Sequence, residues 1–139
     1  MTNPSPYQRD RELEIPLAIL RLSSALFLAV WAFDKILNNQ HAIKTVSKFY
    51  VSVDSTSIIL ALGVVQLIVV LAFAAGLFKT ISYGAVFLMH AVSTVASYQL
   101  YMTPLARPNI LFWAAIPVLA GLLLLFVLRH RDNFLTMGK

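Results

Sequence analysis

Cysteine is absent from this 139-residue chain, and its absence removes several kinds of chemistry. Without thiols the chain cannot supply disulfide exchange, iron–sulfur ligation or a thiolate zinc site. The sequence also lacks an HExxH zinc motif, a Gly-rich phosphate loop and a GxSxG nucleophile motif. We therefore assign no catalytic or metal-binding residue, and we do not expect an enzyme that acts alone.

Charged residues are scarce as well. Only 12% of the residues are charged and 59% are hydrophobic, whereas soluble domains carry about 25% charged residues. Four apolar runs, at about 15–37, 58–78, 80–101 and 110–128, make up most of the chain. At ~1.5 Å per residue, each run is long enough to cross a hydrocarbon core of ~30 Å. The composition predicts an all-α integral membrane protein, a four-helix bundle of up-down-up-down order in one domain, 1–139.

The run at 15–37 is expected to be a retained membrane anchor rather than a cleaved secretory signal. It is longer than the ~7–15 apolar residues of a signal, and Trp31, Asp34 and Lys35 stand where a small-residue cleavage site would be. Pro16 is expected in the first turn of this helix, where its missing N–H breaks no hydrogen bond.

The longest connection, at 38–57, has two interpretations. Its apolar residues recur at helical spacing, with polar residues between them; they include Ala42, Val46, Phe49 and Tyr50. This pattern is typical of a short amphipathic helix on the membrane surface, although an ordered loop packed over the bundle is the alternative. The very short connection between the second and third runs predicts that those two helices are antiparallel neighbours.

The net charge of +5 is explained by residues that flank the membrane. No basic stripe is interleaved with aromatic residues, so nucleic acid is not an expected partner. Both ends of a four-crossing chain lie on one side, and six basic residues fall on that side against four on the other: Arg9, Arg11, Lys79, Arg129, Arg131 and Lys139 against Lys35, Lys44, Lys48 and Arg107. The positive-inside rule then predicts a multi-pass protein of a bacterial-type inner membrane, with cytoplasmic termini.

Ionisable side chains within membrane spans are costly and need an explanation. Arg21 lies roughly 9 Å into the first helix, by the ~1.5 Å rise per residue. In one interpretation its guanidinium reaches back to the cytoplasmic headgroups. In the other, Arg21 turns inward and binds an anionic headgroup or a quinone carbonyl.

Asp34 and Lys35 lie near the far end of the same helix. Lys35 is long enough to extend its ammonium group to the interface. Asp34 has a short stem and is expected to form an ion pair, for which the candidate partners are Arg107, Lys44 and Lys48. The alternative is that Asp34 belongs to a substrate or proton site.

The third run carries a polar stripe. Its members follow one another at steps of 7, 4, 3 and 4 and so share one helical face: Tyr83, His90, Thr94, Ser97 and Tyr101. Hydrocarbon cannot satisfy their hydrogen bonds, so this face is expected to point into the bundle. Gln66 lies at the depth of His90 on the neighbouring helix, which makes a hydrogen bond between them feasible. The stripe either holds helices together or forms a quinone, lipid or proton site around His90.

The chain contains two passages, LRLSSALFLAVWAFDKIL at 20–37 and ALGVVQLIVVLAFAAGLFKTISYGAVFLMHA at 61–91. Both resemble the DoxX-like family of small four-helix membrane proteins. Gln66 stands where relatives often carry an acidic residue, and Phe33-Asp34 replaces a glycine that often precedes the helix 1 lysine. The resemblance implies a small membrane partner in redox or quinone-linked chemistry.

Together these features lead to a first hypothesis, an accessory or anchor subunit of a membrane oxidoreductase. It would have a larger protein partner or form a homo-oligomer, and it would contact membrane lipids. A quinone would be its candidate cofactor, in a pocket built from Arg21, Trp31, Gln66 and His90; Asp34, Lys35, Thr94 and Ser97 are further polar candidates. A non-catalytic structural or lipid-binding subunit is the second hypothesis. A small-solute or proton pathway through Asp34 and His90 is the third.

Overall fold

The computed structural model describes residues 6–50, 52, 54–106 and 108–138, with side chains from Arg11 onward, and this part of the chain is entirely helix and loop. The elements in order are α1 (Pro6–Leu37), α2 (Asn39–Phe49), α3 (Thr56–Ala74), α4 (Lys79–Ala96), α5 (Tyr98–Tyr101), the 3-10 helix η1 (Asn109–Ala114) and α6 (Ala115–Val127). The described residues therefore confirm an all-helical chain.

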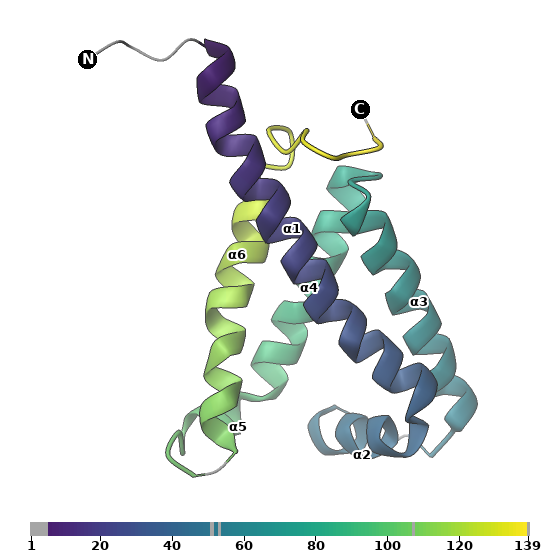
Figure 1. The fold of residues 1–139 in the computed structure, drawn as a ribbon. Helices are drawn as coiled ribbons and strands as arrows, with labels where there is room; N and C mark the ends of the chain where they lie inside the picture. The colour runs from purple at the N-terminus through teal and green to yellow at the C-terminus, as the bar shows by residue number, and fades with distance from the viewer. Residues whose placement is uncertain (1–5, 51, 53, 107, 139) are drawn as a thin grey trace.

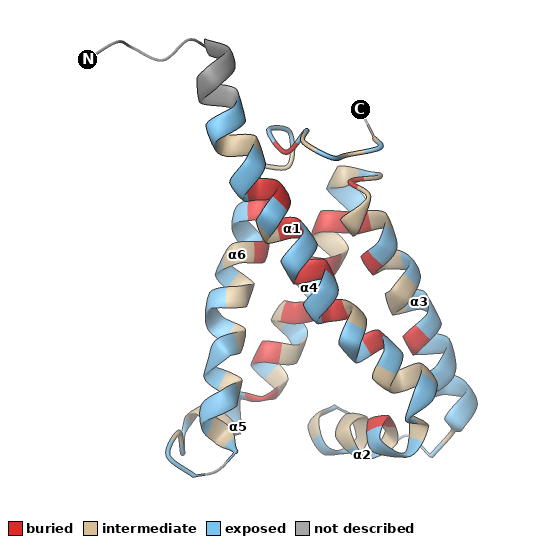
Figure 2. Ribbon diagram, viewed as in Figure 1, coloured by how far each residue is buried: buried red, intermediate tan, exposed pale blue. Residues whose placement is uncertain are grey.

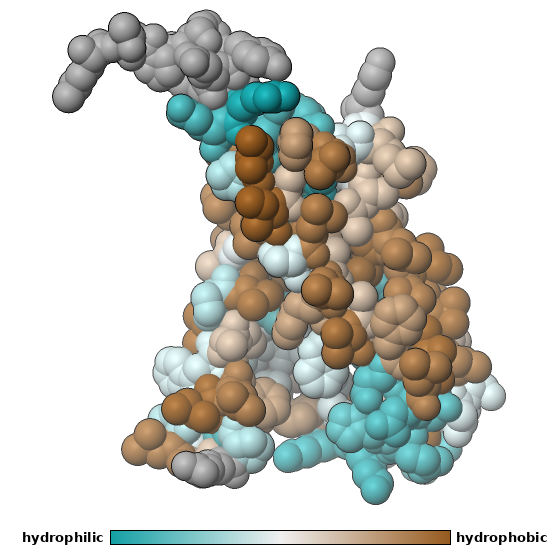
Figure 3. Space-filling model, viewed as in Figure 1, coloured by the Kyte–Doolittle hydropathy of each residue, from teal (hydrophilic) through white to brown (hydrophobic). Residues whose placement is uncertain are grey.

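Three segments have the length and apolar composition needed to cross a membrane: Arg11–Leu37, Thr56–Ala74 and Asn109–Val127. Within their most apolar windows only 39%, 22% and 11% of the residues are buried inside the chain. Most of their apolar side chains therefore face outward. In Figure 3, hydrophobic atoms cover α1 and α3 between a hydrophilic region on the N-terminal part of α1 and another over α2. This is the surface expected of a membrane protein.

The long helices form two pairs. α1 packs mainly against α3, and α4 packs mainly against α6. Figure 1 shows that both described ends of the chain lie at one end of the molecule, where the two pairs come together. At the opposite end the pairs diverge, with α2 on one side and α5 and η1 on the other. The predicted amphipathic helix thus exists as α2, with Ala42 buried and Lys44 and Lys48 exposed.

The core follows the lines along which the helices meet. Buried residues in Figure 2 run along the inner sides of α1 and α4, whereas the described buried residues of α6 are Leu122 and Leu125 alone. The main buried cluster joins α1, α3, α4 and α6: Leu17, Ala25, Leu28, Val70, Phe73, Tyr83, Val86, Leu122 and Leu125. Phe73 and Tyr83 meet edge to face, with ring centroids 4.9 Å apart. The core is therefore concentrated toward the end that holds the termini.

Helix α1 begins at Pro6 rather than near residue 15, so Pro16 lies inside the helix and not in its first turn. The expected position of Pro16 was therefore wrong. A proline in a helix interior leaves the carbonyl four residues earlier without its N–H partner. Here that carbonyl belongs to Glu12, and both Glu12 and Pro16 are exposed. Water or headgroups can reach this carbonyl, so its missing hydrogen bond is tolerated. The charged residues before the apolar run can therefore be part of the helix.

The turn between α3 and α4 confirms that these helices are neighbours. Gly76 adopts φ +66°, and Phe78 adopts φ 47°, so the chain reverses within a few residues. A Cβ atom added to Gly76 would lie 2.5 Å from the side chain of Thr136. The amide of Met137 donates to the carbonyl of Ala75 at 2.8 Å. The C-terminal segment, residues 128–138, therefore lies directly on this turn.

The third apolar run is interrupted rather than continuous. α4 ends at Ala96, and α5 follows after Ser97. The hydroxyl of Thr94 donates to the carbonyl of His90 at 2.8 Å, and that of Ser97 donates to Ser93 at 3.0 Å. Such bonds back to the preceding turn compete with the regular helix pattern and often bend helices.

Candidate functional site

The most connected polar group of the described chain is the guanidinium of Arg21, which is fully buried. Its Nη1 lies 2.5 Å from Oδ1 of Asp132. Its Nη2 donates to the carbonyls of Phe134 and Leu135, both at 2.9 Å, and its Nε donates to the carbonyl of Ala74 at 3.2 Å. The guanidinium therefore turns into the protein, and the interpretation in which it reaches the headgroups is wrong.

Asp132 is also fully buried and joins two further residues to this site. The hydroxyl of Tyr83 donates to Oδ2 of Asp132 at 2.7 Å and lies 3.5 Å from Nη1 of Arg21. Lys79 donates from Nζ to the backbone carbonyl of Asp132 at 2.7 Å and to Asn133 Oδ1 at 2.9 Å. We call Arg21, Lys79, Tyr83 and Asp132 the Arg21 network. It ties α1 and α4 to the C-terminal segment.

The Arg21 network leaves little capacity for a ligand. A guanidinium has five N–H donors, and Arg21 has five acceptors within reach, at Asp132, Tyr83, Phe134, Leu135 and Ala74. A buried pair of opposite charges is tolerated when its remaining donors and acceptors are satisfied in this way. The inward interpretation of Arg21 is thus correct in direction, but its partner is a carboxylate of the same chain.

Asp132 was not singled out from the sequence. It follows Arg129-His130-Arg131 after the last apolar run, so it resembles an ordinary residue of a polar tail. One signal could have identified it. Arg21 needs an opposite charge, and Asp132 is an acidic residue in a strongly basic segment on the same predicted side of the membrane.

His90 and Gln66 lie at different interfaces between helices. His90 is 6% exposed, its Nε2 is 3.0 Å from the carbonyl of Ala115 on α6, and its ring meets Phe27 of α1 edge to face. Gln66 donates its side-chain amide to the carbonyl of Leu28 on α1 at 3.2 Å. The hydrogen bond that was feasible between the two side chains is therefore not formed, because each side chain bonds to the backbone of a different helix.

The polar stripe of the third run does face the interior. Four of its members, Tyr83, His90, Thr94 and Ser97, are buried, which confirms the expected direction. Thr94 and Ser97, however, bond to carbonyls of their own helix, so only Tyr83 and His90 link helices. Among the described residues, Tyr101 has the one buried side-chain polar atom without a hydrogen-bond partner, its hydroxyl oxygen.

The remaining candidates lie near the end of α1. Asp34 pairs with His41 of α2, whose Nδ1 is 2.9 Å and 3.0 Å from the two carboxylate oxygens. Lys44 and Lys48 are therefore not its partners, and Arg107 lies outside the described residues. Lys35 donates to the carbonyl of Trp31 at 3.3 Å, and Trp31 itself is 39% exposed. The four candidate quinone contacts, Arg21, Trp31, Gln66 and His90, therefore do not share a common partner.

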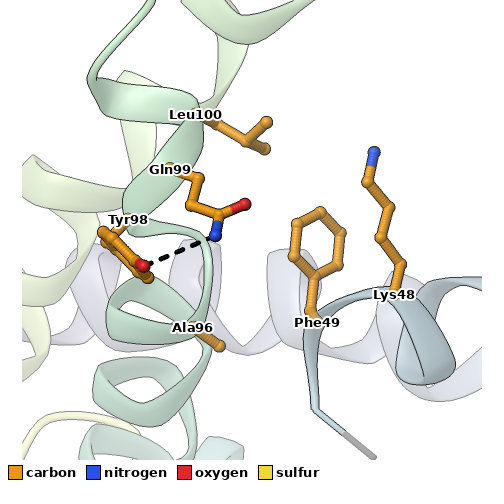
Figure 4. Close-up of a pocket in the computed structure, with 6 residues that line it drawn as sticks. All are labelled: Lys48, Phe49, Ala96, Tyr98, Gln99 and Leu100. Atoms are coloured by element: carbon orange, nitrogen blue, oxygen red, sulfur yellow. Dashed lines mark hydrogen bonds between the residues drawn. The ribbon is translucent and has the colours of Figure 1, made fainter. Parts of the chain in front are cut away.

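Two adjoining hollows lie at the diverging end. The first, of about 180 Å³, is lined by α2, α4 and α5: Lys48, Phe49, Ala96, Tyr98, Gln99 and Leu100. The second, of about 240 Å³, is lined by α2, α5 and η1 and the residue before it: His41, Lys44, Thr45, Lys48, Phe49, Leu100, Pro108, Asn109 and Phe112. Figure 4 shows Gln99 and Leu100 pointing across the first hollow toward Phe49 and Lys48. None of the four proposed quinone contacts lines either hollow.

Within the described part of the chain, no group of three or more His, Asp or Glu side chains is arranged to hold a metal ion. Comparison with known protein families, characterised proteins and solved structures finds no match for this chain.

Proposed function

We propose that this chain is a non-catalytic accessory subunit that anchors or stabilises a larger complex in a membrane. One observation carries the proposal. The strongest internal polar group, Arg21, uses its donors on acceptors of its own chain, while the long helices present apolar side chains outward. Such a molecule is built to hold a shape within lipid rather than to transform a substrate.

We further propose that α4 and α5 form a fourth crossing, which completes the up-down-up-down bundle. The outward side of α4 is apolar, with Ile81, Leu88, Val92 and Val95 each more than half exposed. Its inward side carries the buried polar stripe, which lowers the average hydropathy of the helix. The 18 residues of α4 extend over about 27 Å at ~1.5 Å per residue, and α5 adds a further turn.

The proposed topology has cytoplasmic termini in a bacterial-type inner membrane. Four described basic residues belong to the end that carries the termini, and three belong to the other end (Figure 1): Arg11, Lys79, Arg129 and Arg131 against Lys35, Lys44 and Lys48. This arrangement agrees with the positive-inside rule. Arg9, Arg107 and Lys139 complete the charge comparison, but their side chains lie outside the described residues.

The proposed partner is a membrane oxidoreductase, and the support for this choice is the resemblance of residues 20–37 and 61–91 to the DoxX-like family. Among the three candidate spans, the one formed by η1 and α6 has the smallest buried share, 11% of its apolar window. Lipid or a partner helix can cover this side. A homo-oligomer would use the same surface.

Three measurements test the proposal. The chain should stay with membranes after an alkaline wash, and a cytoplasm-active reporter fused to its C-terminus should be active. Purification in native lipid, followed by mass spectrometry of everything that co-elutes, should recover a stoichiometric protein partner. Release by alkali would overturn the membrane assignment. A lone monomer with transport activity would favour the solute or proton pathway instead.

A further inference from the structure

We infer that the two hollows together bind one anionic phospholipid, with its phosphate on Lys44 and Lys48 and the start of an acyl chain against Phe49, Leu100 and Phe112. We call this site the α2 crevice; its walls are α2 on one side and α5 with η1 on the other. The inference rests on the membrane placement proposed above and gives that proposal a specific lipid contact.

The two hollows form one site because they share three lining residues, Lys48, Phe49 and Leu100. Phe49 stands at their junction. Its ring lies 6.2 Å from that of Phe112 on η1 and 5.2 Å from the ammonium nitrogen of Lys48. A ligand in one hollow would therefore touch residues that also line the other hollow.

The charge of the α2 crevice is positive. Lys44 and Lys48 are four residues apart on α2, so both ammonium groups reach the same side of the helix. None of the described lining residues is acidic. Asp34 pairs with the lining residue His41 at 2.9 Å. The lysines thus remain available, and ammonium groups bind phosphate oxygens through charge-assisted hydrogen bonds.

The position of the α2 crevice fits a lipid headgroup. It lies at the diverging end, beside the ends of α1 and α4 and the start of α3 (Figure 1). If the long helices cross the bilayer, this end lies at headgroup depth, where lysine ammonium groups can reach lipid phosphates. Lysines next to the apolar surfaces of Phe49, Leu100, Pro108 and Phe112 match an amphiphile with a charged head.

The size of the hollows points to part of a ligand rather than a whole one. Pockets that enclose a small molecule have volumes of roughly 300–1,000 Å³, whereas these are about 180 and 240 Å³. A headgroup and the first carbons of a chain would occupy them, and the rest of the chain would lie in the bilayer. A neutral quinone head would leave the two lysines without an anion, so we favour the phospholipid.

The test titrates delipidated, detergent-purified protein with dioleoyl phosphatidylglycerol or dioleoyl phosphatidylcholine and counts bound lipids by native mass spectrometry. The first phosphatidylglycerol should bind at least tenfold more tightly than phosphatidylcholine. Lys44→Gln/Lys48→Gln should remove most of this preference, while the matched control Lys44→Arg/Lys48→Arg should keep it. Leu100→Trp, which retains both charges but fills the hollow, should weaken binding severalfold.

Four outcomes would overturn the inference: equal binding of the two lipids, equal loss in the Gln and Arg double variants, full binding by Leu100→Trp, or displacement of the lipid by ubiquinone. Inorganic phosphate at millimolar concentration should not compete; complete competition would assign the lysines to a soluble anion. If the protein withstands the alkaline wash but shows no lipid preference, only the lipid site fails. If it is released by alkali, the proposed function fails.

Discussion

The two ends of this molecule handle charge in opposite ways. At the end with the termini, Arg21 and Asp132 are both fully buried and bonded to each other, and their other polar atoms are matched by Tyr83 and backbone groups. At the other end, Lys44 and Lys48 are exposed beside an open crevice, and no described acidic residue lines it. The first arrangement satisfies its charges within the chain, and the second leaves two ammonium groups exposed.

This contrast distinguishes charged residues that affect folding, Arg21 and Asp132, from charged residues that are available for binding, Lys44 and Lys48. A buried ion pair gains little net stability over apolar residues of the same shape, but losing one partner is strongly destabilising. An exposed lysine contributes little to folding, so its removal should be detected in binding alone. Four experiments can break or sharpen the comparison.

The largest effect is expected for Asp132→Ala. It leaves the Arg21 guanidinium buried without its counter-charge, a situation that costs about 3–5 kcal/mol. The melting temperature in detergent should fall steeply, or the protein should fail to accumulate. Arg21→Met/Asp132→Leu removes both charges and should recover most of the lost stability. If the double variant is as unstable as Asp132→Ala, the charge pair is not the cause.

A smaller loss is expected for Tyr83→Phe. The ring and its contact with Phe73 are kept, but the 2.7 Å hydrogen bond to Asp132 is removed. A hydrogen bond to a charged group contributes about 1.5–3 kcal/mol. The free energy of unfolding, measured by detergent-based denaturation, should fall by that order. A change below about 0.5 kcal/mol would mean that Asp132 is satisfied without the hydroxyl.

His90→Leu and Gln66→Leu should each cost about 0.6 kcal/mol and at most about 1.7 kcal/mol, the mean and the maximum measured for hydrogen bonds between membrane helices. Because His90 bonds to α6 and Gln66 bonds to α1, their effects should add within about 0.5 kcal/mol. The double variant Gln66→Leu/His90→Leu gives the test. A coupling energy above that value would mean that the two side chains interact directly after all.

The smallest effect is expected for Lys44→Gln/Lys48→Gln in lipid-free detergent. Both lysines are exposed, so the free energy of unfolding should change by less than about 0.5 kcal/mol. The same variant should lose the stabilisation that added phosphatidylglycerol gives to the wild type, because only a ligand bound to the folded state raises its stability. A large loss of unfolding free energy without lipid would mean that these lysines contribute to folding, as Arg21 and Asp132 do.

Part of the fold was predictable because it depends on local patterns. The apolar runs predicted the long helices, and three of them are long and apolar enough to cross a membrane. The spacing of Tyr83, His90, Thr94 and Ser97 predicted an inward face on α4, and all four are buried. Hydropathy and periodicity are properties of neighbouring residues, so they can be read before the helices are packed.

The partners of these residues were harder to predict. The candidate partners of Asp34 were two lysines and Arg107, yet it pairs with His41, seven positions later at the start of α2. His90 and Gln66 both donate to backbone carbonyls, which every residue possesses and which carry no mark in the sequence. The break after Ala96 and the early start of α1 likewise depended on hydroxyl back-bonds and solvent access.

The amino-acid sequence alone determined that this chain is helical, apolar on its outside and polar along one inner stripe, because those features follow from composition and helical spacing. Only the tertiary structure decided that Arg21 meets Asp132, 111 positions away, and that the lysines of α2 face an open crevice. Periodicity tells which way a side chain points from its own helix. What lies opposite depends on how separate helices pack and on where the C-terminal segment folds back over them.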